Sequence, residues 1–346
     1  MKNFLRISKN YGNYVGVGIF TLVFSLLTLT AGLPGSTLFL LEKIGISILL
    51  AVSLSLVVGF LGELSLGHAG FMCVGAYLGG KISVLLEPVI GNGIPLLLVS
   101  ILVGALAAAL CGVIIGIPAL RLRGDYLAIV TLAFGEIVRS LFRNAPDDAF
   151  GGTTGLRTPR YDRGTLFIFI FLFVLIALAV IQNFIRSKHG RAVTAIRDNE
   201  IAARATGINV TKYKLYTFVI SATFAGVAGV FYSFSQYNVP SATFDYNYSI
   251  EILVMVVLGG MGSINGSMLA AALITFINVK LQTVLTGNLA VLQNVIYSLI
   301  LIGIVIYRNA PGLKSFREKY NFAVLIAALT KRAAGKEKEE VQENEQ

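Results

Sequence analysis

Residues 88–120, PVIGNGIPLLLVSILVGALAAALCGVIIGIPAL, contain no Asp, Glu, Lys or Arg, and runs of this kind decide the fold class. Residues 10–41 and 215–244 form two more runs without these charged side chains. A helix needs about 20 predominantly apolar residues to cross a bilayer, and each of the three runs is longer. The sequence therefore predicts an all-α, polytopic membrane protein and excludes a soluble globular enzyme.

The composition of the whole chain of 346 residues agrees with a membrane protein. Hydrophobic residues make up 55% and charged residues 13%, about half the ~25% that is usual in soluble domains, and the mean hydropathy is +0.77. The formal net charge is +10, but the basic residues lie between apolar runs, so they indicate membrane topology rather than a nucleic-acid surface. Cys73 and Cys111 both fall inside apolar runs, which argues against a disulfide framework.

The apolar runs and their boundaries predict about ten transmembrane helices. Their expected ranges are 13–32, 38–60, 65–86, 93–117, 125–142, 164–185, 213–236, 249–259, 264–286 and 289–307. The first run is longer than the ~7–15 apolar residues of a signal peptide, so we expect an uncleaved helix there. The eighth run is too short to cross alone, so it either begins nearer Phe244 or is partly re-entrant.

The distribution of Lys and Arg predicts which segments face the cytoplasm. Residues 186–214 carry seven Lys or Arg side chains against only Asp198 and Glu200, so this loop is expected inside. With ten crossings, both ends of the chain are also expected inside. The predicted organisation is a cytoplasmic N-terminus at 1–12, a transmembrane domain at 13–307 and a cytoplasmic tail at 308–346 that is disordered from about 331 because it is charge-dense and poor in apolar residues.

The sequence contains no motif for covalent chemistry. It has no phosphate-binding GxxxxGK[ST] loop, no HExxH and no CxxC, and its two histidines are His68 and His189. We therefore expect no enzyme activity, no metal site and no cofactor bound by this chain. Active transport would draw its energy from an ion gradient or from another subunit.

The fifth predicted helix carries a clear pair of opposite charges. Glu136 and Arg139 are three residues apart and therefore lie on one face. A charged side chain inside the membrane is costly, so such residues usually face the bundle interior or a wet cavity. This helix is the best candidate to line a translocation pathway. The alternative is that Arg139 reaches the outer surface with Glu136 as its partner.

Two glycine clusters predict irregular helix junctions. Residues 59–71 read GFLGELSLGHAGF, and residues 259–263 read GGMGS. Irregular backbone at membrane depth is tolerated only where protein buries it or where it lines water. His68 would act as a proton relay or as a hydrogen-bonded structural histidine. The residues that we expect along a translocation pathway are Ser65, His68, Tyr126, Glu136, Arg139, Gly259 and Gly260.

The basic loop predicts a short helix outside the membrane. Asp198 is a suitable N-cap for a helix at 199–206, Glu200 suits the positive end of the helix dipole, and Gly207 can end the helix. Its small side chains leave a shallow surface that could dock into a groove of another protein. The alternative is an interfacial helix that lies on anionic lipid.

Five motifs carry a resemblance to a known family. They are SLGHAGFMCVGAY (65–77), GIPALRLRGDYLAIVTLAFGEIVR (116–139), GGTTGL (151–156), GRAVTAIRDNEIAARATGINVTKYKL (190–215) and VVLGGMGSINGS (256–267). In this order, over about residues 40 to 310, they resemble the permeases of branched-chain amino acid ABC importers, specifically the M-type permease. Permeases of urea and short-amide importers are very similar and remain an alternative.

The resemblance implies a subunit of a prokaryotic inner membrane. Such a permease pairs with a homologous second permease, two cytoplasmic ATPases that use ATP and Mg, and an extracytoplasmic binding protein. Residues 202–207, AARATG, resemble the coupling segment that touches the ATPases, although Ile201 stands where Glu often precedes the alanines. The implied coupling residues are Asp198, Glu200, Ala202, Ala203 and Gly207.

Two rival functions predict other features. An ion-coupled secondary carrier would need charged relays in several helices, and only the fifth helix offers a clear pair. A membrane-embedded enzyme would need a convergent catalytic cluster, which the sequence lacks. The leading hypothesis is that ATP binding to the partner subunits moves the 198–207 helix as a lever.

Overall fold

The computed structural model describes residues 16–19, 21–23, 34–122, 124–284, 295–296, 298–299, 302–303 and 306. The chain divides into two units, Met1–Thr283 and Val284–Gln346. The expectations for 1–12, for most of 13–32, for most of 289–307 and for 308–346 lie outside the described residues.

The described part of the first unit is predominantly helical, as predicted. The elements are α2 (Gly35–Ser55), the π-helix η1 (Leu56–Leu61), α3 (His68–Ile90), α4 (Ile94–Ala119), α5 (Asp125–Arg143), α6 (Asp147–Phe150), β1 (Leu156–Arg157), α7 (Arg163–Arg186), α8 (Lys188–Asp198), α9 (Glu200–Ala205), α10 (Val210–Gln236), β2 (Asn238–Val239), the 3₁₀ turn η2 (Ser241–Phe244), α11 (Tyr246–Gly259) and α12 (Ile264–Val284). The two strands form one short antiparallel pair, with Leu156 opposite Val239.

Six helices among the described residues are long and apolar enough to cross a membrane: α2 with η1, α3, α4, α7, α10 and α12. The predicted ranges from 38–60 to 264–286 all contain a helix, with ends shifted by a few residues. Helix α11 begins at Tyr246, so the eighth run does extend back toward Phe244. Its 14 residues span only about 21 Å at 1.5 Å per residue. The count of ten crossings and the orientation stay predictions.

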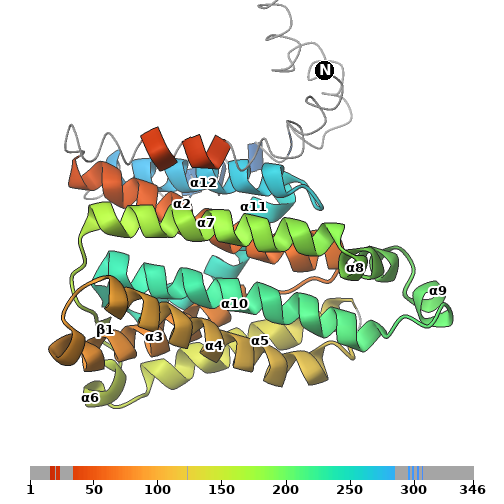
Figure 1. Ribbon diagram of the computed structural model, residues 1–346, viewed down its shortest axis with the longest axis horizontal. Helices are drawn as coiled ribbons and strands as arrows, with labels where there is room; N and C mark the ends of the chain where they lie inside the picture. The colour runs from red at the N-terminus through yellow and green to blue at the C-terminus, as the bar shows by residue number, and fades with distance from the viewer. Residues whose placement is uncertain are drawn as a thin grey trace, which may run out of the picture. The chain divides into compact units, whose positions relative to one another are not determined.

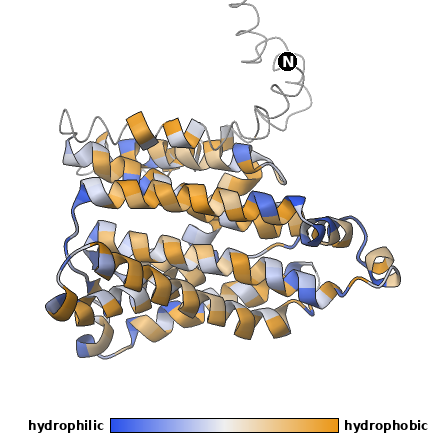
Figure 2. Ribbon diagram, viewed as in Figure 1, coloured by the Kyte–Doolittle hydropathy of each residue, from blue (hydrophilic) through white to orange (hydrophobic). Residues whose placement is uncertain are grey.

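Helix α4 buries small residues and exposes leucines, the reverse of what a soluble helix does. Its small residues are buried, whereas its leucines at four-residue spacing are exposed by 46–62%. The buried set is Gly104, Ala108, Gly112 and Gly116, and the exposed set is Leu98, Leu102, Leu106 and Leu110. Small side chains let membrane helices approach closely, while leucine is compatible with lipid tails. Figure 2 shows that the long helices consist mostly of hydrophobic residues.

Helix α10 packs against α2, α3 and α4. A Cβ added to Gly75 of α3 would overlap the carbonyl oxygen of Gly226, and one added to Gly229 would overlap the carbonyl oxygen of Met72. Glycine is therefore required where α3 and α10 touch through their backbones. Figure 1 shows α8 and α9 at one end of α7 and α10, and β1 and α6 at the opposite end.

Candidate coupling site and translocation pathway

The membrane helix formed by α2 and η1 is interrupted before α3 begins. The π-helix ends at Leu61 and is followed by Gly62, whose φ of +78° lies in the left-handed region that glycine tolerates. Residues 62–67, which we call the helix break, have no regular structure. The break was expected from the glycines, whereas the π-helix was not. Single π-helical turns often occur at functional sites.

Buried side chains from two other helices accept hydrogen bonds from backbone N–H groups at the end of the helix break. Thr131 Oγ1 on α5 accepts a 3.0 Å hydrogen bond from the Leu66 N–H. Ser249 Oγ on α11 accepts one of 3.1 Å from the Ala69 N–H. Both side chains are at most 2% exposed. The end of the helix break is thus hydrogen-bonded within the protein, whereas Gly62 at its start is exposed.

Arg197 at the end of α8 connects the basic loop to the membrane helices. Its guanidinium donates a 3.2 Å hydrogen bond to the carbonyl oxygen of Gly59 in η1. A Cβ on Gly59 would lie 2.5 Å from the N atom of Gly262, which belongs to the turn between α11 and α12. The π-helix, the second glycine cluster and the basic loop therefore meet at one place.

Lys214 at the start of α10 makes a second connection. Its side chain is only 3% exposed, and its ammonium pairs with Glu63 of the helix break and, at 3.1 Å, with Glu200 of α9. Glu200 also accepts a 2.8 Å hydrogen bond from Arg204. A buried charge is tolerated when it is paired. This network attaches α9 to α10 and to the helix break.

The structure corrects the predicted cap of the short helix. The residue that caps α9 is Asn199, whose Oδ1 accepts a 3.0 Å hydrogen bond from the Ala202 N–H. Asp198 is the last residue of α8, and its carboxylate pairs with Arg197. The loop contains two helices, α8 and α9, where one was expected. Because α8 extends through Asp198, the next residue, Asn199, becomes the N-cap of α9.

The predicted end of α9 is confirmed. Gly207 has a φ of +84°, and the Ile208 N–H donates to the carbonyl oxygen of Ala203, which is the Schellman pattern of a helix C-terminus. Ala203 is 4% exposed, whereas Ile201 is 75% exposed and Ala202 is exposed. Helix α9 therefore presents a small apolar surface. It lies beside a cavity of about 600 Å³ lined by Leu61–Leu64, Gly124, Asp125, Ile196–Ile201 and Lys214.

Four of the predicted pathway residues gather near the helix break. Ser65 and His68 are each 2% exposed; the Ser65 Oγ has no hydrogen-bond partner in the described part of the chain, and His68 Nε2 lies 2.8 Å from Ser53 Oγ. Gly259 and Gly260 end α11 and lead into the turn that touches the π-helix. A histidine enclosed in this way is suited to a structural role.

The other three predicted pathway residues lie on α5. Arg139 donates a 3.0 Å hydrogen bond from Nε to Glu136, which confirms that the two share a face. Their side chains are 26% and 29% exposed, and Tyr126 is 71% exposed. Glu136 and Arg139 thus form one partly exposed pair, and Tyr126 lies near the other end of α5.

Sequence reasoning missed the ionic contacts of Glu63, Arg197 and Lys214. The signal was present, because Glu63 lies inside the first glycine cluster and Lys214 lies inside a predicted membrane helix, and charges in such places usually have a specific partner.

The chain is similar to the members of a known protein family. A family model described as the permease component of the branched-chain amino acid transport system matches residues 36–307. The chain belongs to this permease family. Together with the six membrane-competent helices, membership identifies a multi-pass membrane protein.

Three individual relatives are also named as permeases of branched-chain amino acid transport. The permease is 39% identical over 265 residues to the high-affinity branched-chain amino acid transport system permease protein LivM of Salmonella typhimurium, covering 66% of this chain and 60% of the relative. It is 39% identical over 261 residues to Escherichia coli LivM, with the same coverage. A probable LivM of Methanocaldococcus jannaschii is 28% identical over 174 residues, covering 48% of the permease and 50% of the relative. The permease thus spans about 60% of the length of the first two relatives. No solved structure matches the chain.

Proposed function

We propose that this chain is the transmembrane permease subunit of an ATP-driven ABC importer for branched-chain amino acids in a prokaryotic inner membrane. It forms the translocation pathway with a homologous second permease and receives cargo from an extracytoplasmic binding protein. Two cytoplasmic ATPases supply the energy from ATP and Mg, so this chain is a transport subunit and no enzyme. Family membership and the names of the relatives support the substrate class.

The observation that carries the coupling role is the attachment of α9 to the helix break. Helix α9 exposes Ile201 and Ala202 for docking, while Glu200 pairs with Lys214, which also holds Glu63. A push on α9 by a closing ATPase is therefore transmitted to the broken membrane helix. ATP supplies the bias because it binds the closed ATPases more tightly. The coupling residues are Asp198, Glu200, Ala202, Ala203 and Gly207.

The pathway in this proposal passes the helix break and the polar face of α5. Its lining residues are Ser65, His68, Tyr126, Glu136, Arg139, Gly259 and Gly260. An aliphatic amino acid needs few polar contacts along most of its route, in keeping with the scarcity of charge in the spans.

The test of coupling is Gly207→Asp in the complex reconstituted with its ATPases and binding protein. We expect loss of leucine uptake, with ATP hydrolysis no longer stimulated by the loaded binding protein and with normal membrane insertion. Gly91→Asp is the matched control, since Gly91 has a similar φ of +76°, an equally open environment and a position away from the loop. Normal uptake by Gly207→Asp would contradict the lever role.

Two further outcomes would favour a different transport function. Uptake by this chain without any ATPase would indicate a secondary carrier. Uptake of urea or acetamide in preference to leucine would indicate a permease of the short-amide type.

A further inference from the structure

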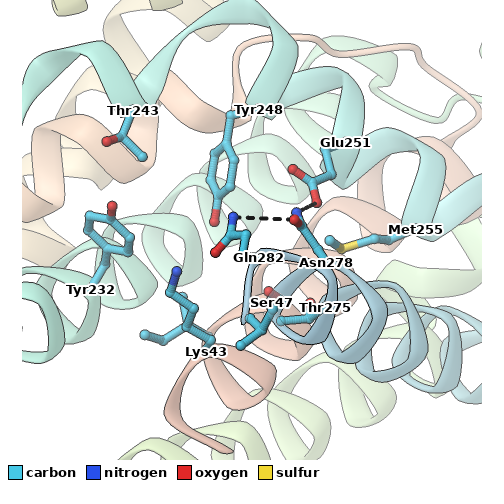
Figure 3. A pocket seen from close by; sticks show the side chains of 12 residues that line it. Lys43, Ser47, Tyr232, Thr243, Tyr248, Glu251, Met255, Thr275, Asn278 and Gln282 are labelled. Carbon is cyan, nitrogen blue, oxygen red and sulfur yellow. Dashed lines mark hydrogen bonds between the residues drawn. The ribbon is translucent and has the colours of Figure 1, made fainter. Parts of the chain in front are cut away.

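A polar cavity lies inside the membrane-spanning part of the bundle, away from the coupling site. Its volume is about 210 Å³, and it is bordered by α2, α10, η2, α11 and α12. A single water needs only about 10–15 Å³ of such volume, so the cavity has room for a larger solute. Figure 3 shows side chains from these separate elements converging on it. The principal polar ones are Lys43, Tyr232, Tyr248, Glu251, Asn278 and Gln282.

The cavity contains both signs of charge. Lys43 comes from α2 and Glu251 from α11, so these two charges are separate from the Glu136–Arg139 pair of α5. The Lys43 ammonium lies 4.9 Å from the centroid of the Phe39 ring, and none of the ion pairs between described residues includes it. Charged residues within membrane spans usually mark substrate or ion pathways.

The negative side of the cavity is held in place by hydrogen bonds. Asn278 donates a 3.0 Å hydrogen bond to Glu251 Oε1, and Gln282 donates one of 3.3 Å to Asn278 Oδ1 (Figure 3). Both amide side chains come from α12. The carboxylate is thus positioned before any ligand arrives, which lowers the entropy cost of binding.

A buried hydroxyl in the cavity wall lacks a partner. Thr275 is 6% exposed, and its Oγ1 makes no hydrogen bond to any residue that the structure describes. Buried polar groups are nearly always hydrogen-bonded, so an exception calls for an explanation. A ligand with its own polar atoms would supply the missing contact.

The lining also includes an apolar wall made by Ile46, Met255 and Val279. One cation, one positioned carboxylate and an apolar wall match the three parts of an aliphatic α-amino acid, namely its carboxylate, its ammonium and its side chain. We propose that this cavity is a binding site for a zwitterionic aliphatic α-amino acid within the permease itself. The inference rests on the proposed function and adds a substrate site to it.

The location suits a site where cargo is received. Helix α10 begins at Val210, next to α9, and ends at Gln236, next to β2, and Tyr232 lies one turn from this second end. Gln282 lies near the end of α12. With the basic loop in the cytoplasm, the cavity lies in the outward half of the membrane.

The test measures equilibrium binding of radiolabelled leucine to the permease complex in nanodiscs, without the binding protein. Lys43→Met and Glu251→Gln should each raise the Kd for leucine tenfold or more, because each removes a charge-assisted contact. Lys280→Met is the control, since Lys280 is an exposed cation of the same helix as Asn278 but does not line the cavity. Lys43→Arg should retain most of the affinity.

Two leucine analogues assign each charge to its partner in competition assays. For 4-methylpentanoate, which has no ammonium, affinity should fall in Lys43→Met and stay nearly unchanged in Glu251→Gln. For leucinamide, which has no carboxylate, the pattern should be reversed. If a charge variant fails to assemble, the near-isosteric Thr275→Val still applies, and it should weaken leucine binding severalfold.

The outcomes separate the two proposals. If the wild-type complex imports leucine but shows no saturable leucine binding, or if the cavity variants bind at the wild-type level, the cavity site is wrong and the proposed function stands. If the wild-type complex imports no aliphatic amino acid, the proposed function itself is wrong.

Discussion

Lys214 on α10 forms an ion pair with Glu63 in the helix break, although the two residues are 151 positions apart in the chain. The same ammonium reaches Glu200 on α9. Three segments that are separate in sequence are therefore joined through one buried cation.

Replacing that cation with methionine should destabilise the permease. In Lys214→Met, Glu63, whose side chain is only 13% exposed, loses its partner. Breaking a largely buried ion pair in this way costs on the order of 3 kcal/mol. We expect a lower thermal unfolding temperature in detergent and a loss of coupled ATP hydrolysis. Lys212→Met, which alters an exposed cation two positions earlier, should leave both unchanged. An unaltered unfolding temperature in Lys214→Met would show that the pair contributes nothing.

Arg197→Gln should reduce transport without reducing the stability of the permease. The variant removes the hydrogen bond to the Gly59 carbonyl, so movement of α8 and α9 would reach the π-helix less directly. We expect normal insertion and basal ATP hydrolysis, with leucine uptake reduced severalfold. Arg191→Gln removes an exposed arginine from the same helix and should transport normally. Equal uptake by the two variants would exclude the role assigned to Arg197.

Asn199→Ala should loosen α9. Its side chain caps the helix, and loss of such a cap typically costs about 1 kcal/mol. Hydrogen exchange at the amides of residues 202–205 should become faster. Asp198→Ala should change this exchange much less, because Asp198 pairs with Arg197 and does not cap the helix. Faster exchange in Asp198→Ala than in Asn199→Ala would restore the cap predicted from the sequence.

Gly75→Ala should destabilise the bundle. The added methyl group would overlap the backbone of Gly226, and backbone cannot rotate away as a side chain can. We expect a lower unfolding temperature and reduced membrane yield. Gly135→Ala is the matched control, because a Cβ there would lie 3.8 Å or more from its neighbours, an ordinary contact distance. Equal stability of the two variants would contradict the close approach of α3 and α10.

Hydropathy predicted the six described helices that are long and apolar enough to cross a membrane. The run at 88–120 became α4, and the glycines at 59–71 marked a real interruption. These features are local, since apolar length and glycine content depend only on neighbouring residues.

Contacts between distant segments could not be predicted in the same way. Nothing in the local sequence pattern indicates that Arg197 contacts Gly59. Nor does it indicate that Lys43 and Glu251 line the same cavity. The cap was predicted wrongly because Asp198 and Asn199 are both good N-caps. The choice between them depends on where α8 ends, and the pattern of the loop did not show that helix.

The glycine contacts between α3 and α10 also limit how the permease can move. Where backbone touches backbone, as at Gly75 with Gly226 and Gly229 with Met72, one helix cannot slide along the other without bringing a larger side chain into the space of a glycine. We therefore expect these two helices to move together as one rigid body. In the proposed transport cycle we expect the bending to occur at the short irregular segment 62–67, which joins this helix pair to the π-helix.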